Sequence, residues 1–103
     1  MYAVIFKASI KQLDDNYTTT ANNMRKLAMT RYGCTGFTSC SEGNKEIAIS
    51  YWPSLEAIKG WKKDIEHQQA QKLGKEKWYS AYQVEVVEVL RQYSYETMSD
   101  KEK

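Results

Sequence analysis

The fold is decided mainly by one stretch, residues 49–89, which reads ISYWPSLEAIKGWKKDIEHQQAQKLGKEKWYSAYQVEVVEV. Near its start, Pro53 restricts Trp52 to an extended backbone, and Ser54 is a typical N-cap for the residues that follow. The apolar spacing after Ser54 predicts a short helix that reaches Trp61. The stretch therefore begins as a strand that leads directly into a helix.

A second helix and a last strand complete this stretch. Asp64 restarts the helix, and we expect it to continue to about Tyr79. Residues 82–91 then form a strand whose apolar positions change phase between Val86 and Val87. Such a change indicates either a β-bulge or burial on both faces.

The start of the chain has a similar order. Residues 2–10 alternate as a strand, and apolar residues occupy both of its faces in the first part, so we expect both faces to be covered. An amphipathic helix follows from Asp14 or Asp15 to about Tyr32, where Gly33 ends it. The first half thus supplies another strand and another helix.

Two further strands, Thr35–Ser41 and Lys45–Trp52, flank a glycine-containing turn and are expected to form a hairpin. The whole order is then β-α-β-β-α-β, the ferredoxin-like pattern of an α+β fold with a four-stranded antiparallel sheet and both helices on one face. Because the first and last strands carry apolar residues on both faces, we expect a homodimer whose bare sheet faces pack together. Residues 1–93 form this single domain, and residues 94–103 are expected to be a polar, frayed tail.

Composition and charge narrow the classes of function. The chain has 103 residues and a formal charge of +2, and its 15 basic residues form no clustered stripe, so we expect no nucleic acid partner. No apolar run reaches the ~20 residues of a membrane helix, and a basic leader is missing, so we expect a cytoplasmic protein that binds no membrane. Cys34 and Cys40 are expected to be reduced, and a structural metal has too few ligands.

The only histidine of the chain, His67, lies in the second predicted helix. At about 3.6 residues per turn it shares the inward face of that helix with Ala70, Gln71, Gly74 and Trp78, while the lysines point away. A glycine inside a helix costs ~1 kcal/mol relative to alanine. Gly74 therefore indicates that backbone or a ligand comes close to the helix at this point.

Two interpretations of His67 stay open on the residues alone. In the first, His67 is a buried histidine hydrogen-bonded to a strand, and the small residues beside it let helix and sheet pack closely. In the second, His67 and Gln71 line a pocket between helix and sheet, with Trp61, Trp78 or Trp52 as an apolar wall. The second interpretation makes His67 a candidate base, because its intrinsic pKa lies near neutrality.

The same stretch, residues 49–89, closely resembles the antibiotic biosynthesis monooxygenase (ABM) superfamily. The motifs that carry the resemblance are W-x-S-x-E-A-I-x-x-W, E-H-x-x-A-Q-x-x-G and W-Y-x-x-Y, and the run GCTGFTSC after the first helix is similar to a further element of the family. The resemblance implies a dimeric α+β barrel. Members include small oxygenases that oxidise aromatic or quinol-like substrates without metal or flavin, and a branch that binds and degrades heme.

For this chain the resemblance implies a cofactor-independent monooxygenase with a small aromatic or quinol-like substrate. His67 is then the catalytic base and Gln71 an orienting amide, while Trp61, Gly74 and Trp78 complete the substrate-binding site. Two alternatives remain: a protein that binds or degrades heme as its cofactor, and a dimeric module that binds a small molecule without catalysis.

Overall fold

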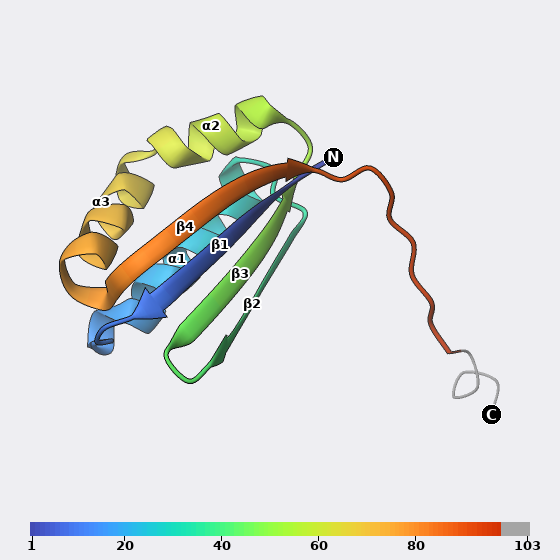
Figure 1. Cartoon of the computed structure of the whole chain (residues 1–103). Coiled ribbons are helices and arrows are strands. Elements are labelled where there is room, and N and C mark those ends of the chain that lie inside the picture. Colours follow the sequence, from blue (N-terminus) through green and yellow to red (C-terminus); the bar gives the residue numbers. More distant parts are fainter. Residues whose placement is uncertain (98–103) are drawn as a thin grey trace.

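The structure is a computed structural model that describes residues 1–97. Its four strands form one antiparallel sheet in the order β2-β3-β1-β4, and the helices lie on one face of it (Figure 1). This confirms the predicted α+β fold with ferredoxin-like order. The elements are β1 (Tyr2–Ile10), α1 (Asp15–Arg31), β2 (Gly36–Glu42), β3 (Lys45–Trp52), α2 (Leu55–Lys63), α3 (Ile65–Leu73), η1 (Gly74–Trp78) and β4 (Tyr79–Glu88).

Short polar residues and a glycine set the ends of the first two long helices. Asp14 caps α1 by accepting a hydrogen bond from the backbone N–H of Asn16, and Gly33 leaves the helix with a φ of +77°. Ser54 caps α2 in the predicted manner through the N–H of Ala57. Within residues 1–97, no helix has the length and apolar character that crossing a membrane requires.

The hairpin turn is shorter than predicted. β2 continues through Glu42, so the turn consists of Gly43 and Asn44. Gly43 has a φ of +59°, while no other residue type adopts a positive φ in the described part of the chain. A positive φ at the first turn position alone is typical of a type II′ turn, which strongly favours glycine there.

The second predicted helix differs from expectation in its last turn. The break before α3 is confirmed, because the backbone of Asp64 is extended. However, residues 74–78 form a π-helical turn, η1, in place of a regular α-helical turn, and Tyr79 already belongs to β4. The predicted helix to Tyr79 was therefore one residue too long and wrong in the geometry of its end.

β4 begins and ends three residues earlier than the predicted strand, residues 82–91. Val86 pairs with Val4 and Val87 with Ala3, so the register is regular where the apolar pattern changes phase. The only shift between β1 and β4 lies at the other end, next to Ile10. The phase change therefore reflects apolar residues on both faces of β4, and the alternative of a bulge at this point was wrong.

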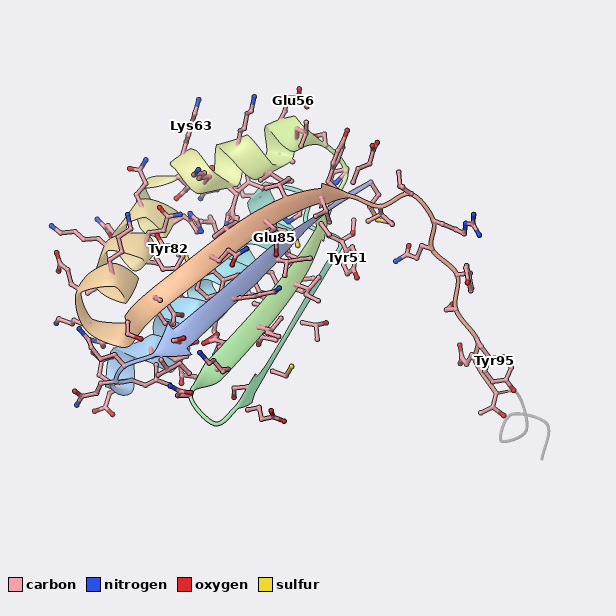
Figure 2. All side chains as sticks on the ribbon, in the orientation of Figure 1. Tyr51, Glu56, Lys63, Tyr82, Glu85 and Tyr95 are labelled. Atoms are coloured by element: carbon pink, nitrogen blue, oxygen red, sulfur yellow. The ribbon has the colours of Figure 1, made fainter. Side chains whose placement is uncertain are left out.

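The sheet face without helices, here called the open face, carries an apolar band. Ile5 of β1 pairs with Ile49 of β3, and both lie on this face with Val87, which is 37% exposed. Figure 2 shows Tyr51 and Glu85 on the same side of the sheet. The prediction that one sheet face is bare of helices is thus confirmed for the described chain.

Beyond β4 the chain runs away from the sheet as an arm, residues 90–97 (Figure 1). Leu90, Tyr93 and Tyr95 on this arm are 84–90% exposed, and Figure 2 shows Tyr95 far from the sheet. The predicted tail, residues 94–103, begins within the arm, and its last six residues lie outside the described residues. The frayed state of the tail stays a prediction.

One end of the layer between sheet and helices, here called the packed end, is a close-packed core. Trp52 is fully buried, and its ring lies 5.1 Å from the ring of Trp61. Leu27 and Ala28 of α1 and Ile58 of α2 pack in the same cluster. These contacts hold α1 and α2 on the sheet at this end and fix the position of Trp61.

Candidate functional site

A cavity of about 640 Å³ lies between the sheet and the helices. It exists because β3 directs its isoleucines to the open face, while Glu46, Ala48 and Ser50 occupy its helix-facing positions. Ala48 and Ser50 are too small to fill the space below the helices. The volume falls in the ~300–1,000 Å³ range of small-molecule sites.

The cavity is lined by every residue that the sequence marked as a candidate: Trp61, His67, Gln71, Gly74 and Trp78. The third tryptophan considered as a wall, Trp52, does not line it, because Trp52 is fully buried in the packed end. His67 lines the cavity, as in the second interpretation, and its backbone partner is Lys62 of α2 instead of the strand residue that the first interpretation required.

His67 lies against Trp61, with ring centroids 3.9 Å apart and planes inclined by 40°. Burial lowers the pKa of His67 below its usual value, and a hydrogen bond with the backbone of Lys62 opposes part of this effect. The imidazole is therefore mainly neutral near pH 7 and can accept a proton. Its Nδ1 atom is buried and has no hydrogen-bond partner in the described structure.

The three tryptophans are all buried, yet their indole N–H groups differ. Trp52 Nε1 donates to Ser50 Oγ at 2.8 Å, and Trp78 Nε1 donates to Asp14 Oδ1 at 3.0 Å. Trp61 Nε1 has no partner within the described residues. Buried polar groups are nearly always satisfied, so Trp61 Nε1 and His67 Nδ1 are exceptions, and they belong to two side chains that line the cavity.

Gly74 is required by a side chain rather than by a neighbouring backbone. A Cβ atom at this position would lie 3.0 Å from two ring atoms of Tyr79. Such a contact is closer than van der Waals packing permits, so the ring would have to move. Gly74 therefore lets Tyr79 lie against the π-helical turn and reach into the cavity, where it lines the end opposite the packed end.

At this opposite end lies a group of three residues, here called the Tyr–Glu cluster: Tyr17 of α1, Glu46 of β3 and Tyr79 of β4. The hydroxyl of Tyr17 hydrogen-bonds to both carboxylate oxygens of Glu46, and the hydroxyl of Tyr79 donates to that of Tyr17 at 3.4 Å. Burial raises the pKa of Tyr79 to about 12, and burial together with the bond to Glu46 raises the pKa of Tyr17 still further. Both phenols therefore stay protonated at neutral pH.

Sequence reasoning missed the Tyr–Glu cluster. The available signal was Glu46, which alternates with the isoleucines of β3 and so had to face the helices if the isoleucines faced away. Alternation alone does not decide which face of β3 the helices cover. Tyr17 lines the cavity from α1.

Aromatic rings continue the wall near this end. The ring of Phe6 lies 5.4 Å from that of Tyr79 and 5.5 Å from that of Tyr82. Val84 and Val86 also line the cavity but are each 50% exposed, so the cavity opens to solvent beside β4. Across residues 1–97 no cluster of three or more His, Cys, Asp or Glu side chains is arranged to hold a metal ion.

Comparisons with known proteins agree with the fold described above. No family model matches the chain. The uncharacterized protein YqjZ of Bacillus subtilis is 40% identical over 92 residues, which cover 88% of this chain and 81% of YqjZ.

Among solved structures, a variant of SnoaB, a cofactor-independent oxygenase from Streptomyces nogalater, has a TM-score of 0.75 at 8% identity and covers 88% of this chain and 94% of its own. An antibiotic biosynthesis monooxygenase has a TM-score of 0.65 at 14% identity, over 88% of this chain and all of its own. Two further neighbours with the same fold, from Deinococcus radiodurans and Nitrosomonas europaea, are described as putative antibiotic biosynthesis monooxygenases, whereas others are described as proteins of unknown function. The chain belongs to the same family as YqjZ, and it has the fold of the antibiotic biosynthesis monooxygenases.

Proposed function

We propose that the protein is a cofactor-independent monooxygenase that oxidises a small aromatic or quinol-like substrate in the cavity. The observation that carries this proposal is the pair of buried, unpaired polar atoms, Trp61 Nε1 and His67 Nδ1, on adjacent residues of the cavity wall. Each such atom costs ~1–3 kcal/mol unless a ligand satisfies it. SnoaB, which shares the fold and is described as a cofactor-independent oxygenase, supports the class of reaction.

In the first step His67 acts as the general base. Because burial lowers its pKa, the imidazole is unprotonated near neutral pH and can remove a proton from a phenolic hydroxyl or an activated C–H group of the substrate. The product of this step is an electron-rich anion held in an apolar cavity, where water does not stabilise it.

Trp61 then stabilises the anion. Its N–H is fixed by the packed end and has no competing acceptor, so it can donate to the oxygen on which negative charge develops. Trp61 need not break an internal hydrogen bond to do so.

The substrate anion supplies all the electrons that dioxygen requires. When a ring CH₂ or the C–H of a hydroquinone is oxidised, the carbon takes up one oxygen atom and the other leaves as water, so a CH₂ becomes C=O and a hydroquinone becomes a hydroxyquinone. In both cases the substrate loses four electrons and dioxygen gains four. The reaction therefore balances without flavin, metal or an added reductant.

The other three candidate residues hold the substrate in place. Gln71 lines the cavity one helical turn after His67, where its amide can orient a substrate oxygen. Gly74 leaves room for the ring of Tyr79, and Trp78, held by its bond to Asp14, forms part of the aromatic wall. A rigid wall of this kind favours flat, aromatic ligands.

Oxygen uptake by the purified protein tests the proposal. A panel of hydroquinones, naphthalenediols and anthrones is incubated with protein in the presence of a chelator and without flavin or heme. We expect at least one compound to be oxidised with one dioxygen consumed per molecule. If some compounds bind but none raises oxygen uptake above the protein-free rate, the protein is better described as a dimeric module that binds a small molecule without catalysis.

Heme is tested in the same preparation. Under the proposal, titration with heme produces no Soret band that saturates at one equivalent per protomer, and heme does not stimulate oxygen uptake. A saturating band that disappears in His67→Ala would instead identify His67 as a heme ligand and contradict a cofactor-free site.

We also propose that the working form is a homodimer in which the open faces of two copies pack together. The apolar band of the open face, where Val87 is exposed and Ile5 and Ile49 are partly exposed, and the arm with Tyr93 and Tyr95 support this, because monomers rarely leave such surfaces in water. Analytical ultracentrifugation should give twice the mass of one chain for the natural protein and one chain for Ile49→Lys. A monomeric natural protein at micromolar concentration would contradict the dimer.

The cytoplasm is the proposed compartment. Cys34 and Cys40 are both free thiols, one buried and one exposed, as is usual for proteins of a reducing compartment. A fluorescent fusion expressed in a Bacillus host should distribute through the cell interior, and enrichment at the envelope would contradict this placement.

A further inference from the structure

We infer that the Tyr–Glu cluster is a second recognition site in the same cavity, which binds a hydroxyl group at the end of the ligand remote from His67. The ligand class is then a flat aromatic diol whose two hydroxyl groups lie at opposite ends of a fused ring system. This inference deepens the proposed function and rests on it only in placing a ligand in the cavity. The geometry of Tyr17, Glu46 and Tyr79 carries it.

The three residues come from three different elements and all line the cavity. Tyr17 lies in the first turn of α1, and the ring of Trp78 packs edge-on against it at 5.2 Å. Asp14, the cap of α1, accepts the N–H of the same Trp78. The start of α1, the π-helical turn and β3 are thereby tied together, so Glu46 is held at the cavity wall by a fixed frame.

Glu46 can accept more hydrogen bonds than its neighbours donate to it. A carboxylate offers about four lone-pair positions on its two oxygens, whereas Tyr17 brings a single proton to it. In the described residues no lysine or arginine forms an ion pair with Glu46, since the ion pairs found there join Lys7 to Glu85 and Arg31 to Asp64. Glu46 therefore retains free acceptor positions beside the cavity.

These properties select the chemistry of the ligand group. A carboxylate accepts hydrogen bonds and donates none, so the group opposite Glu46 has to be a donor, and an ether or a second carboxylate does not fit. The cluster already contains this arrangement, because Glu46 binds the phenolic hydroxyl of Tyr17 and Tyr17 accepts the hydroxyl of Tyr79. A phenolic hydroxyl of the ligand would add a third member of the same kind.

The two ends of the cavity are far enough apart for a fused ring system. Trp61 packs on Phe37, which pairs with Ser50 of β3, and Glu46 lies four residues before Ser50 on the same strand. At roughly 3.3 Å per residue this corresponds to about 13 Å along the sheet. A naphthalene- or anthracene-sized diol can thus direct one hydroxyl to Trp61 and His67 and the other to Glu46, with Phe6 and Tyr82 beside its rings.

Equilibrium binding without oxygen tests the inference separately from catalysis. Isothermal titration under nitrogen compares 2,6-dihydroxynaphthalene with 2,6-dimethoxynaphthalene, which has the same ring system and acceptor oxygens but no donor in either orientation. We expect the natural protein to prefer the diol, and Glu46→Gln to lower this preference by about ten- to a hundredfold, since a hydrogen bond to a charged group is worth that ratio. Glu85→Gln on the open face is the matched control and should leave the preference unchanged.

The outcomes separate the two proposals. If Glu46→Gln keeps the preference of the natural protein, the inference is wrong even when the diol is oxidised in air. If the preference depends on Glu46 but no diol consumes oxygen, the recognition site stands and the monooxygenase proposal falls. Should Glu46→Gln not fold, the natural protein decides alone, because equal affinity for the diol and its dimethyl ether already contradicts a donor-selective site.

Discussion

The two ends of the cavity satisfy their polar groups in opposite ways. At the packed end, Trp61 and His67 have a well-determined position but leave one polar atom each without a partner. At the other end, Tyr17, Glu46 and Tyr79 bond to one another, and Trp78 bonds to Asp14. The packed end is therefore rigid but has polar atoms without hydrogen-bond partners. At the other end the polar groups are bonded to one another, and Glu46 can still accept a further hydrogen bond.

This difference indicates a division of work between chemistry and recognition. Groups that act on a transition state gain most when they are fixed in advance and have no competing partner, as Trp61 and His67 are. Groups that select a ligand can replace hydrogen bonds to one another by hydrogen bonds to the ligand at little net cost in free energy. Substitutions at the packed end should therefore change the rate, whereas substitutions at the other end should change stability and ligand preference.

The largest effect is expected from His67→Ala. Removal of a general base lowers kcat by about 10²- to 10⁴-fold, and stability should also decrease, because the variant loses the ring contact with Trp61 and the hydrogen bond with the backbone of Lys62. Oxygen uptake with the best diol of the panel gives the rate, and urea unfolding gives the stability. Gln68→Ala, an exposed neighbour on α3, is the control and should keep the rate of the natural protein.

Trp61→Phe should come next. It keeps an aromatic ring at the packed end but removes the unpaired N–H, so kcat should fall by about 10²- to 10³-fold, as for the loss of one donor to a developing oxyanion. The same oxygen assay measures this. If the rate of Trp61→Phe stays within twofold of the natural rate, the indole N–H has no part in the reaction.

Trp78→Phe is the matched change at the other end and should show the reverse pattern. It removes the bond to Asp14, so the free energy of unfolding should decrease by about 1–2 kcal/mol, while kcat changes less than in Trp61→Phe. Chemical unfolding monitored by circular dichroism measures the loss. An equal loss of rate in the two variants would show that the two ends do not differ in the proposed way.

The smallest effect concerns pH. Because burial lowers the folded-state pKa of His67 below its unfolded value of about 6.5, the unfolded chain binds more protons between these two values. Stability is then fully present above pH ~6.5 and decreases as the pH falls toward the folded pKa, and kcat/KM should decrease over the same range. In His67→Ala the slope of stability against pH should become shallower below pH ~6.5.

Much of the fold could be predicted from the sequence because local rules and the final structure agree. Asp14, Gly33 and Ser54 end or begin elements where their backbone preferences place them, and the two-faced apolar pattern of β1 was recognisable. The π-helical turn could not be predicted, since it depends on the contact of Gly74 with Tyr79, which is formed only when β4 returns to the sheet.

The candidate site was predicted in part for a similar reason. Helical spacing placed His67, Gln71 and Gly74 on one inward line, and all three line the cavity. Glu46 was missed because alternation along a strand divides residues into two faces without saying which face the helices cover. That choice depends on the packing of the whole sheet, so the second end of the cavity became visible only in three dimensions.

Turnover in isotopically labelled dioxygen tests the central claim most directly. The purified protein, with chelator present and with flavin, metal and heme absent, is supplied with the diol or anthrone that gave the fastest oxygen uptake. The account predicts that each product molecule contains one labelled oxygen atom and that the other appears in water, at a rate that falls about 100-fold or more in His67→Ala. Product without label, or equal labelled product from the natural protein and His67→Ala, would contradict a cofactor-independent monooxygenase that uses His67.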